Sequence, residues 1–198
     1  MQIQDIPTLY RWHGKLANEG EGITKLQHAW QCAQLARRAG ATVALQLAAW
    51  LHDVGHLMTG LQGTPTARGI NDGHETLAAR ALEPLLGPEV AQPIALHVDA
   101  KRYLVHTQPE YALRLSPDSV RSLALQGGQM TAAEAHVFIQ KPFVRDALRL
   151  RTWDDLGKDP DWQPGSTDEA LTWLHQLLGQ VSSLHATPAS GAPAAATT

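Results

Sequence analysis

Histidines and aspartates spread along this chain have the residue types and the spacing to bind metal ions. The most compact group is the adjacent pair His52 and Asp53, at the end of an apolar run. On a helix, neighbouring side chains project about 100° apart, so both can reach one metal cluster, and the two carboxylate oxygens can bridge two ions. More candidates precede and follow this pair, and together they read H…HD…H…H…D: His28, His52, Asp53, His74, His97 and Asp154.

This set is rich in nitrogen and oxygen donors and contains no thiolate. Such donors suit iron, manganese or other first-row ions and argue against a structural zinc site of the cysteine type. Because six ligands exceed what one ion usually takes from protein, the set implies two metals with Asp53 as the bridge. His52 and His56 also form an H-x-x-x-H pair, but Asp53 stands where the metalloprotease pattern has glutamate, so we reject that class. A lone histidine such as His28 is more often a packed core residue, and the prediction therefore depends on the whole set.

Composition limits the other function classes. The 198-residue chain has a net charge of −3 and thus no basic excess of the kind that nucleic acid requires. Its one cysteine, Cys32, cannot form an internal disulfide, and we find neither a signal peptide nor an apolar run long enough to span a bilayer. We expect a cytoplasmic protein with one domain over residues 1–181 and a disordered Ala/Pro/Ser/Thr-rich tail over 182–198.

Helical periodicity and capping signals predict an all-α fold, a helical bundle in a single domain. Capping boxes are expected at Thr24 with Gln27, at Asp72 with Glu75 and at Thr131 with Glu134, and Ser116 precedes a proline at the first helical position. No strand pattern of useful length is present. The expected helices span residues 6–18, 25–38, 43–56, 72–86, a stretch from about 93 to 103, 117–126, one after 131, 142–153 and 166–178.

The ligand set and several short stretches resemble the HD-domain superfamily of metal-dependent phosphohydrolases. Within it, they resemble the mixed-valent diiron oxygenases that include myo-inositol oxygenase, and most closely the PhnZ-type enzymes, which oxidatively cleave the carbon–phosphorus bond of 1-hydroxylated aminophosphonates. The H…HD…H…H…D order is shared across the superfamily. The sequences His97-Val-Asp-Ala-Lys-Arg-Tyr103 and Leu125-Gln-Gly-Gly128 are narrower signals, and the matching stretches lie within residues 20 to 160.

The resemblance implies a role for each candidate residue. One iron would be held by His28, His52, Asp53 and Asp154, and the other by Asp53, His74 and His97. O2 would be the co-substrate, and the products would be phosphate and glycine or a methylated glycine. The relatives have a tyrosine shortly before the first ligand that can occupy the open iron site, whereas the corresponding region here, Asn18-Glu-Gly-Glu-Gly22, contains none. The substrate contacts implied are the phosphonate donors Lys101, Ser119, Ser122, Gln126 and Arg151, with His56 near the substrate and Glu21 facing its ammonium group.

Two other functions fit the same ligands. An HD phosphohydrolase would use two metals to activate water against a phosphate ester or nucleotide. A degenerate HD domain would bind a ligand without turnover, but the presence of all six ligands disfavours it. The sequence leaves open the amine substituent of the substrate, the group that replaces the tyrosine, the metal's redox state and the oligomeric state.

Overall fold

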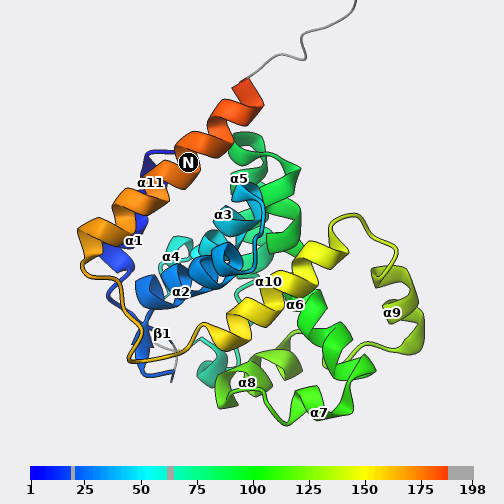
Figure 1. Ribbon diagram of the computed structural model, residues 1–198. Helices are drawn as coiled ribbons and strands as arrows, with labels where there is room; N and C mark the ends of the chain where they lie inside the picture. The colour runs from blue at the N-terminus through cyan, green and yellow to red at the C-terminus, as the bar shows by residue number, and fades with distance from the viewer. Residues whose placement is uncertain (19–20, 62–64, 187–198) are drawn as a thin grey trace, which may run out of the picture.

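Helices form nearly all of the regular structure, as the sequence predicts (Figure 1). The computed structural model describes residues 1–18, 21–61 and 65–186. The elements are α1 (Asp5–His13), β1 (Ala17–Asn18), β2 (Ile23–Thr24), α2 (Lys25–Arg38), α3 (Val43–Leu51), α4 (Val54–Met58), the short 3₁₀ helix η1 (Thr66–Arg68), α5 (His74–Leu86), α6 (Pro88–Thr107), α7 (Pro109–Ala112), α8 (Pro117–Leu125), α9 (Ala132–Phe138), α10 (Val144–Leu156) and α11 (Thr167–Ala186).

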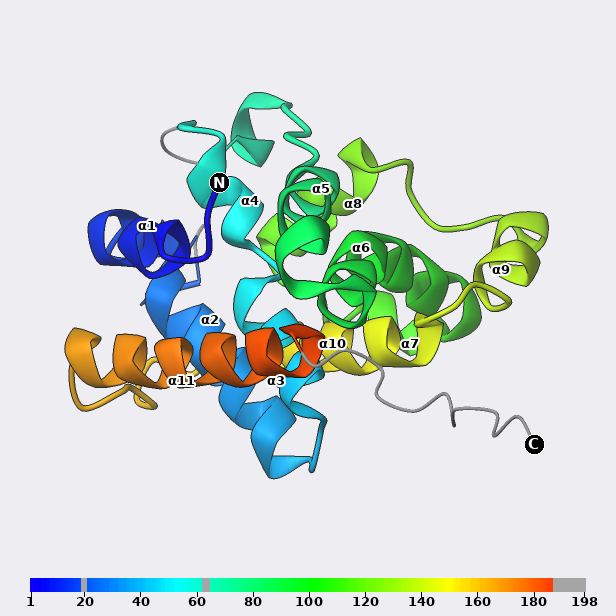
Figure 2. The same cartoon turned by 90° about the horizontal axis from the view of Figure 1, so that it is seen from above.

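Helix α3 is the centre of the main core. It packs against α2, α6, α10 and α11, and its residues Leu47, Ala48 and Trp50 are fully buried. A helix that is apolar all round has no face for solvent, so its central place follows from its sequence. Figures 1 and 2 show α11 lying across the outside of this core.

The longest helix that carries ligands, α6, joins the main core to a smaller one. It packs along α5 on one side and α10 on the other. Leu96 and Ala100 of α6 meet Phe138 of α9 and Val144 of α10 in the second cluster, which lies on the right of Figure 1. Two buried cores thereby hold α2, α3, α5, α6 and α10, and the predicted ligands lie on these helices or in the turn that follows α3.

The expected helix over residues 43–56 is interrupted at the His-Asp pair, which corrects the prediction. Helix α3 ends at Leu51 and α4 begins at Val54. Between them, Asp53 has φ −99° and ψ 5°, outside the regular helical region. His52 and Asp53 therefore lie in a sharp turn at the end of a buried helix, and the break directs both side chains into the same space.

Three smaller expectations also change. The first helix ends at His13 rather than residue 18, because Ala17–Asn18 pairs in antiparallel fashion with Ile23–Thr24. Helix α5 has Gly73, not Asp72, as its N-cap, with no side-chain cap. Helix α11 continues to Ala186, so the first five residues of the predicted tail are helical, and residues 187–198 lie outside the described part. No helix in the described residues is long and apolar enough to cross a membrane.

Candidate active site

Four histidines from different helices point their Nε2 atoms at one small space. His28 comes from α2, His52 from the end of α3, His74 from the start of α5 and His97 from the middle of α6. All four residues are at most 5% exposed. The Nε2 atoms of His28 and His52 are 3.3 Å apart, and those of His74 and His97 are 3.2 Å apart. The histidines thus form two pairs.

The opposite nitrogen of each ring, Nδ1, is held by the protein. The Nδ1 of His28 lies 2.8 Å from the carbonyl of Gly157, and those of His52 and His97 lie 2.9 Å and 2.7 Å from carbonyls in their own helices. A carbonyl accepts only, so Nδ1 carries the proton and Nε2 presents a lone pair to the centre. Histidines that ligate metals in proteins are oriented in this way.

Asp53 lies between the two histidine pairs. Its Oδ1 is 3.5 Å from the Nε2 of both His52 and His74, and its Oδ2 is 3.7 Å from the Nε2 of His28. On the first pair's side, the Oδ1 of Asp154 is 3.3 Å from the Nε2 of His28. One carboxylate therefore reaches both pairs, as a bridging ligand does, whereas Asp154 reaches only one.

These donors fit metal ions by their chemistry as well as by their spacing. Burial lowers the pKa of His52, but the carboxylates of Asp53 and Asp154 outweigh burial and raise it to about 9. Asp53 has its pKa lowered although burial raises it, because His52, His56 and His74 surround it. Around His52 and Asp53 the site therefore favours positive charge, which metal cations supply.

Two glycines allow the helices to approach closely enough. A Cβ on Gly55 would lie 2.1 Å from the carbonyl oxygen of His74, so only glycine lets α4 reach the start of α5. A Cβ on Gly157 would lie 2.6 Å from the sulfur of Cys32 on α2. Gly157 also supplies the carbonyl that binds His28. The contact at Gly55 is with backbone and would not be relieved by a rotamer change, whereas at Gly157 the added atom would also lie 3.0 Å from the carbonyl oxygen of Trp153.

Asp72, which the sequence predicts to cap α5, instead contacts the side chains of His56 and His74. Its side chain is 5% exposed, and its two oxygens contact the Nδ1 atoms of His56 at 2.5 Å and of His74 at 3.0 Å. The two imidazole rings are stacked, with centroids 3.8 Å apart. Burial raises the pKa of Asp72, but these hydrogen bonds outweigh it and hold the pKa well below its ordinary range. Asp72 therefore fixes both rings, and the sequence signal was an Asp two residues before a candidate ligand.

A cavity of about 70 Å³ lies beside the ligands. Lys101, which is 3% exposed, donates to Ser122 at 2.7 Å there, and burial together with Arg151 lowers the pKa of Lys101 to about 7. The Oε1 of Gln126 is buried without a hydrogen-bond partner among the described residues. All the residues predicted on the substrate side line this cavity: Glu21, His56, Lys101, Ser119, Ser122, Gln126 and Arg151.

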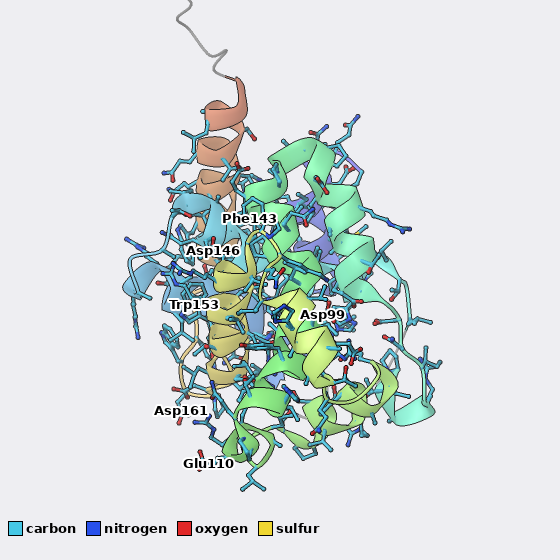
Figure 3. The ribbon with its side chains drawn as sticks, turned by 90° about the vertical axis from the view of Figure 1, so that its right-hand side faces the viewer. Asp99, Glu110, Phe143, Asp146, Trp153 and Asp161 are labelled. Atoms are coloured by element: carbon cyan, nitrogen blue, oxygen red, sulfur yellow. The ribbon has the colours of Figure 1, made fainter. Side chains whose placement is uncertain are left out.

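Arg151 is engaged with the paired aspartates at the end of α10, the helix marked by Asp146 and Trp153 in Figure 3. Its NH1 donates to Asp154 at 2.6 Å, and its other nitrogens donate to Asp155 and to the hydroxyl of Tyr111. Tyr111 in turn donates to Asp155 at 2.5 Å. Asp155 therefore accepts from a cation and a hydroxyl, and Arg151 orients Asp154 toward the histidines.

Glu21 has a partner that the sequence did not predict. Its Oε1 is 3.0 Å from the Nζ of Lys158, and both side chains are largely buried. Lys158 also lies 3.5 Å from the hydroxyl of Ser116, which caps α8. This ion pair joins the segment after β1 to the segment after α10 across the cavity.

The comparisons with known proteins agree with this geometry. Residues 26–128 match the family model of the HD domain. The chain belongs to the HD-domain family. The matched range includes the first five candidate ligands and ends before Asp154.

Two relatives of this HD-domain protein are dioxygenases. It is 45% identical over 139 residues to a hydroxymethylphosphonate dioxygenase of Gimesia maris, covering 70% of this chain and 69% of the relative. It is 37% identical over 145 residues to the [1-hydroxy-2-(trimethylamino)ethyl]phosphonate dioxygenase (glycine-betaine-forming) of Leisingera caerulea, covering 73% and 74%. An uncharacterized protein, L432 of Acanthamoeba polyphaga mimivirus, is 35% identical over 158 residues, covering 79% and 72%. The chain is an HD-domain oxygenase of the PhnZ type.

Proposed function

We propose that this HD-domain oxygenase uses O2 to cleave the carbon–phosphorus bond of a 1-hydroxyalkylphosphonate at a diiron centre. The observation that carries the proposal is that the candidate ligand set, with Asp53 between its two histidine pairs, lies beside a cavity lined by Lys101 and Arg151. Buried cations next to hydroxyl and amide groups suit a phosphonate dianion. The two dioxygenase relatives act on phosphonates that share a hydroxyl on the carbon bound to phosphorus.

The ligand set would hold two irons, one by His28, His52, Asp53 and Asp154 and the other by Asp53, His74 and His97. When bound, the irons supply the redox chemistry that activates O2 and the Lewis acidity that holds the hydroxyl and phosphonate oxygens. The C–P bond breaks, phosphorus leaves as inorganic phosphate, and C1 leaves as a carboxylate. The substrate gives up four electrons to one O2, whose atoms enter the products, so no external reductant is consumed.

The protein's own groups bind and orient the phosphonate. The ammonium of Lys101 and the hydroxyls of Ser119 and Ser122 donate to its oxygens, and the amide of Gln126 can turn its NH2 end toward them. His56, stacked on His74 and fixed by Asp72, faces the substrate from the ligand side. Arg151 contributes its charge while it holds Asp154 in place. Burial of these donors excludes water from the reacting carbon.

Oxygen dependence separates this function from metal-dependent hydrolysis. Protein loaded with iron, at about two ions per chain for this ligand count, is mixed with 1-hydroxyalkylphosphonates and, in parallel, with phosphate monoesters. We expect phosphate from the phosphonates in air and none under argon. Equal release without O2, or release from the esters alone, would favour the HD phosphohydrolase instead.

The nature of the group on C1 is a finer question. The sequence predicts an aminated substrate and hence glycine or a methylated glycine as product. The relatives named above include one that acts on a trimethylated amine and one that acts on hydroxymethylphosphonate, which has no amine.

A further inference from the structure

Every carboxylate that lines the cavity in the described residues already has a partner within the protein. Glu21 is paired with Lys158, and Asp72 with two histidines. Asp53 and Asp154 face the ligand histidines, and Asp118 accepts from Thr66 and Arg121. An ammonium on the substrate would therefore have to displace an existing ion pair to find a counter-charge.

The Glu21–Lys158 pair is held from both sides. Lys158 stands between Gly157, whose carbonyl binds His28, and Asp159, whose backbone N–H donates to Gln31 at 3.0 Å. The backbone of Glu21 donates to the carbonyl of Asn18 at 2.8 Å, closing the turn after β1. The lysine side chain is 17% exposed and the glutamate 13%. A pair this well shielded keeps much of its electrostatic strength.

The cavity also lacks the features that bind quaternary ammonium groups. Such groups are held against the faces of Trp, Tyr or Phe. None of these residues lines the cavity in the described part of the chain, whereas Lys25, Lys101, Arg151 and Lys158 do. The cavity of about 70 Å³ is also small beside the roughly 300–1,000 Å³ of pockets for drug-sized ligands.

We infer that Lys158, by occupying Glu21, makes the site select 1-hydroxyalkylphosphonates without an amine, of which hydroxymethylphosphonate is the smallest. This inference rests on the proposed function and names its substrate class. For that substrate the C–P bond breaks, C1 becomes formate, phosphorus becomes inorganic phosphate and one proton is released. Four electrons pass to one O2, and both its atoms enter the two products.

The test separates charge from size. The iron-loaded full-length protein is assayed in air with hydroxymethylphosphonate, 2-amino-1-hydroxyethylphosphonate and 1-hydroxypropylphosphonate, the last being an isostere of the aminated compound with a methyl in place of the ammonium. Phosphate, formate and glycine are measured. We expect kcat/KM for the propyl compound to exceed that for the aminated compound at least tenfold.

Two variants test whether the ion pair causes the selectivity. Lys158→Met frees the Glu21 carboxylate, so the preference for the propyl compound over the aminated one should fall at least tenfold. Glu21→Gln leaves the lysine without its counter-charge, so the same ratio should rise. The opposite signs exclude a general loss of structure, which would lower both rates together, and iron content and circular dichroism check that each variant is folded.

The outcomes distinguish a failure of this inference from a failure of the proposed function. If the wild-type protein turns over the aminated compound as well as its isostere, or if Lys158→Met leaves the ratio unchanged, the inference is overturned and C–P cleavage stands. If no phosphonate yields phosphate in air, the proposed function fails and the inference fails with it.

Discussion

The ligand cluster and the proposed substrate side of the cavity are built in different ways. Each ligand histidine is held by a backbone carbonyl or, for His74, by Asp72, and all four lie on helices fixed by the cores. On the proposed substrate side, the contacts join side chains to one another. Lys101 reaches Ser122 on α8, and Glu21 reaches Lys158 across 137 positions of sequence.

This difference suggests separate roles: the ligand cluster would support the metal chemistry, and the side-chain pairs around the cavity would determine which substrate binds. Lone pairs oriented by backbone groups keep their geometry whatever occupies the cavity, which is the requirement for a metal centre. Pairs of long side chains can be rebuilt by one substitution without changing a helix. The two dioxygenase relatives act on different phosphonates. This is consistent with a substrate side that varies around a ligand cluster that does not.

The largest effect is expected where a ligand is removed from the cluster. Asp154→Asn replaces the carboxylate that lies 3.3 Å from His28 and 2.6 Å from Arg151, and leaves a buried guanidinium beside the metal site. Bound iron should fall by about half or more, and activity by at least ~100-fold, beyond the 10–100-fold typical of outer-shell groups. Metal analysis measures the bound iron, and phosphate release measures the activity.

Asp155→Asn is the matched control on the same helix. It weakens the contacts to Arg151 and Tyr111 but touches no ligand histidine, so most of the iron and activity should remain. If Asp155→Asn loses iron and Asp154→Asn keeps it, the assignment of the last ligand moves to Asp155.

An intermediate effect is expected from the residue that orients two rings. Asp72→Asn keeps the shape of the side chain but replaces one acceptor with a donor that faces the Nδ1–H of His56 or His74. Activity should fall by about 10–100-fold, with weaker iron binding. Asp118→Asn, which lines the same cavity but contacts Thr66 and Arg121, should cost far less. Equal losses in both variants would show that Asp72 acts only through the cavity's charge.

The ligand cluster and the substrate side also differ in how far they could be predicted from sequence. The convergence of the candidate ligands could be predicted from sequence because His28, His74, His97 and Asp154 lie on strongly periodic helices. The turn at His52 and Asp53 changed the local geometry but still brought both side chains into the same space. Capping at Thr24, Ser116 and Thr131 is local chemistry and is confirmed. The sequence predicts only a local cap at Asp72, because an Asp that binds a side chain from the preceding helix cannot be distinguished in sequence from one that caps the next helix.

Contacts between distant segments could not be predicted. Nothing near Glu21 indicates that Lys158 lies beside it, because their approach depends on Gln31 and Gly157 placing the chain after α10 against α2. The same is true of Tyr111, whose hydroxyl completes the Arg151–Asp155 network. The candidate ligands could therefore be proposed from sequence, while the pairing of charges in the cavity needed the tertiary structure.

The smallest of these effects is expected from Lys101, and it depends on pH. Burial and the neighbouring Arg151 lower its pKa to about 7, so Lys101 carries its charge below that pH and loses it as the pH rises. The wild-type KM for a 1-hydroxyalkylphosphonate should therefore increase across neutral pH. Lys101→Met should raise KM about tenfold at low pH, the loss of one charge-assisted hydrogen bond, and should have little effect at high pH. The ionisation of the phosphonate is common to both proteins and cancels in their ratio. A ratio of KM values that stays constant with pH would show that Lys101 does not titrate in this range.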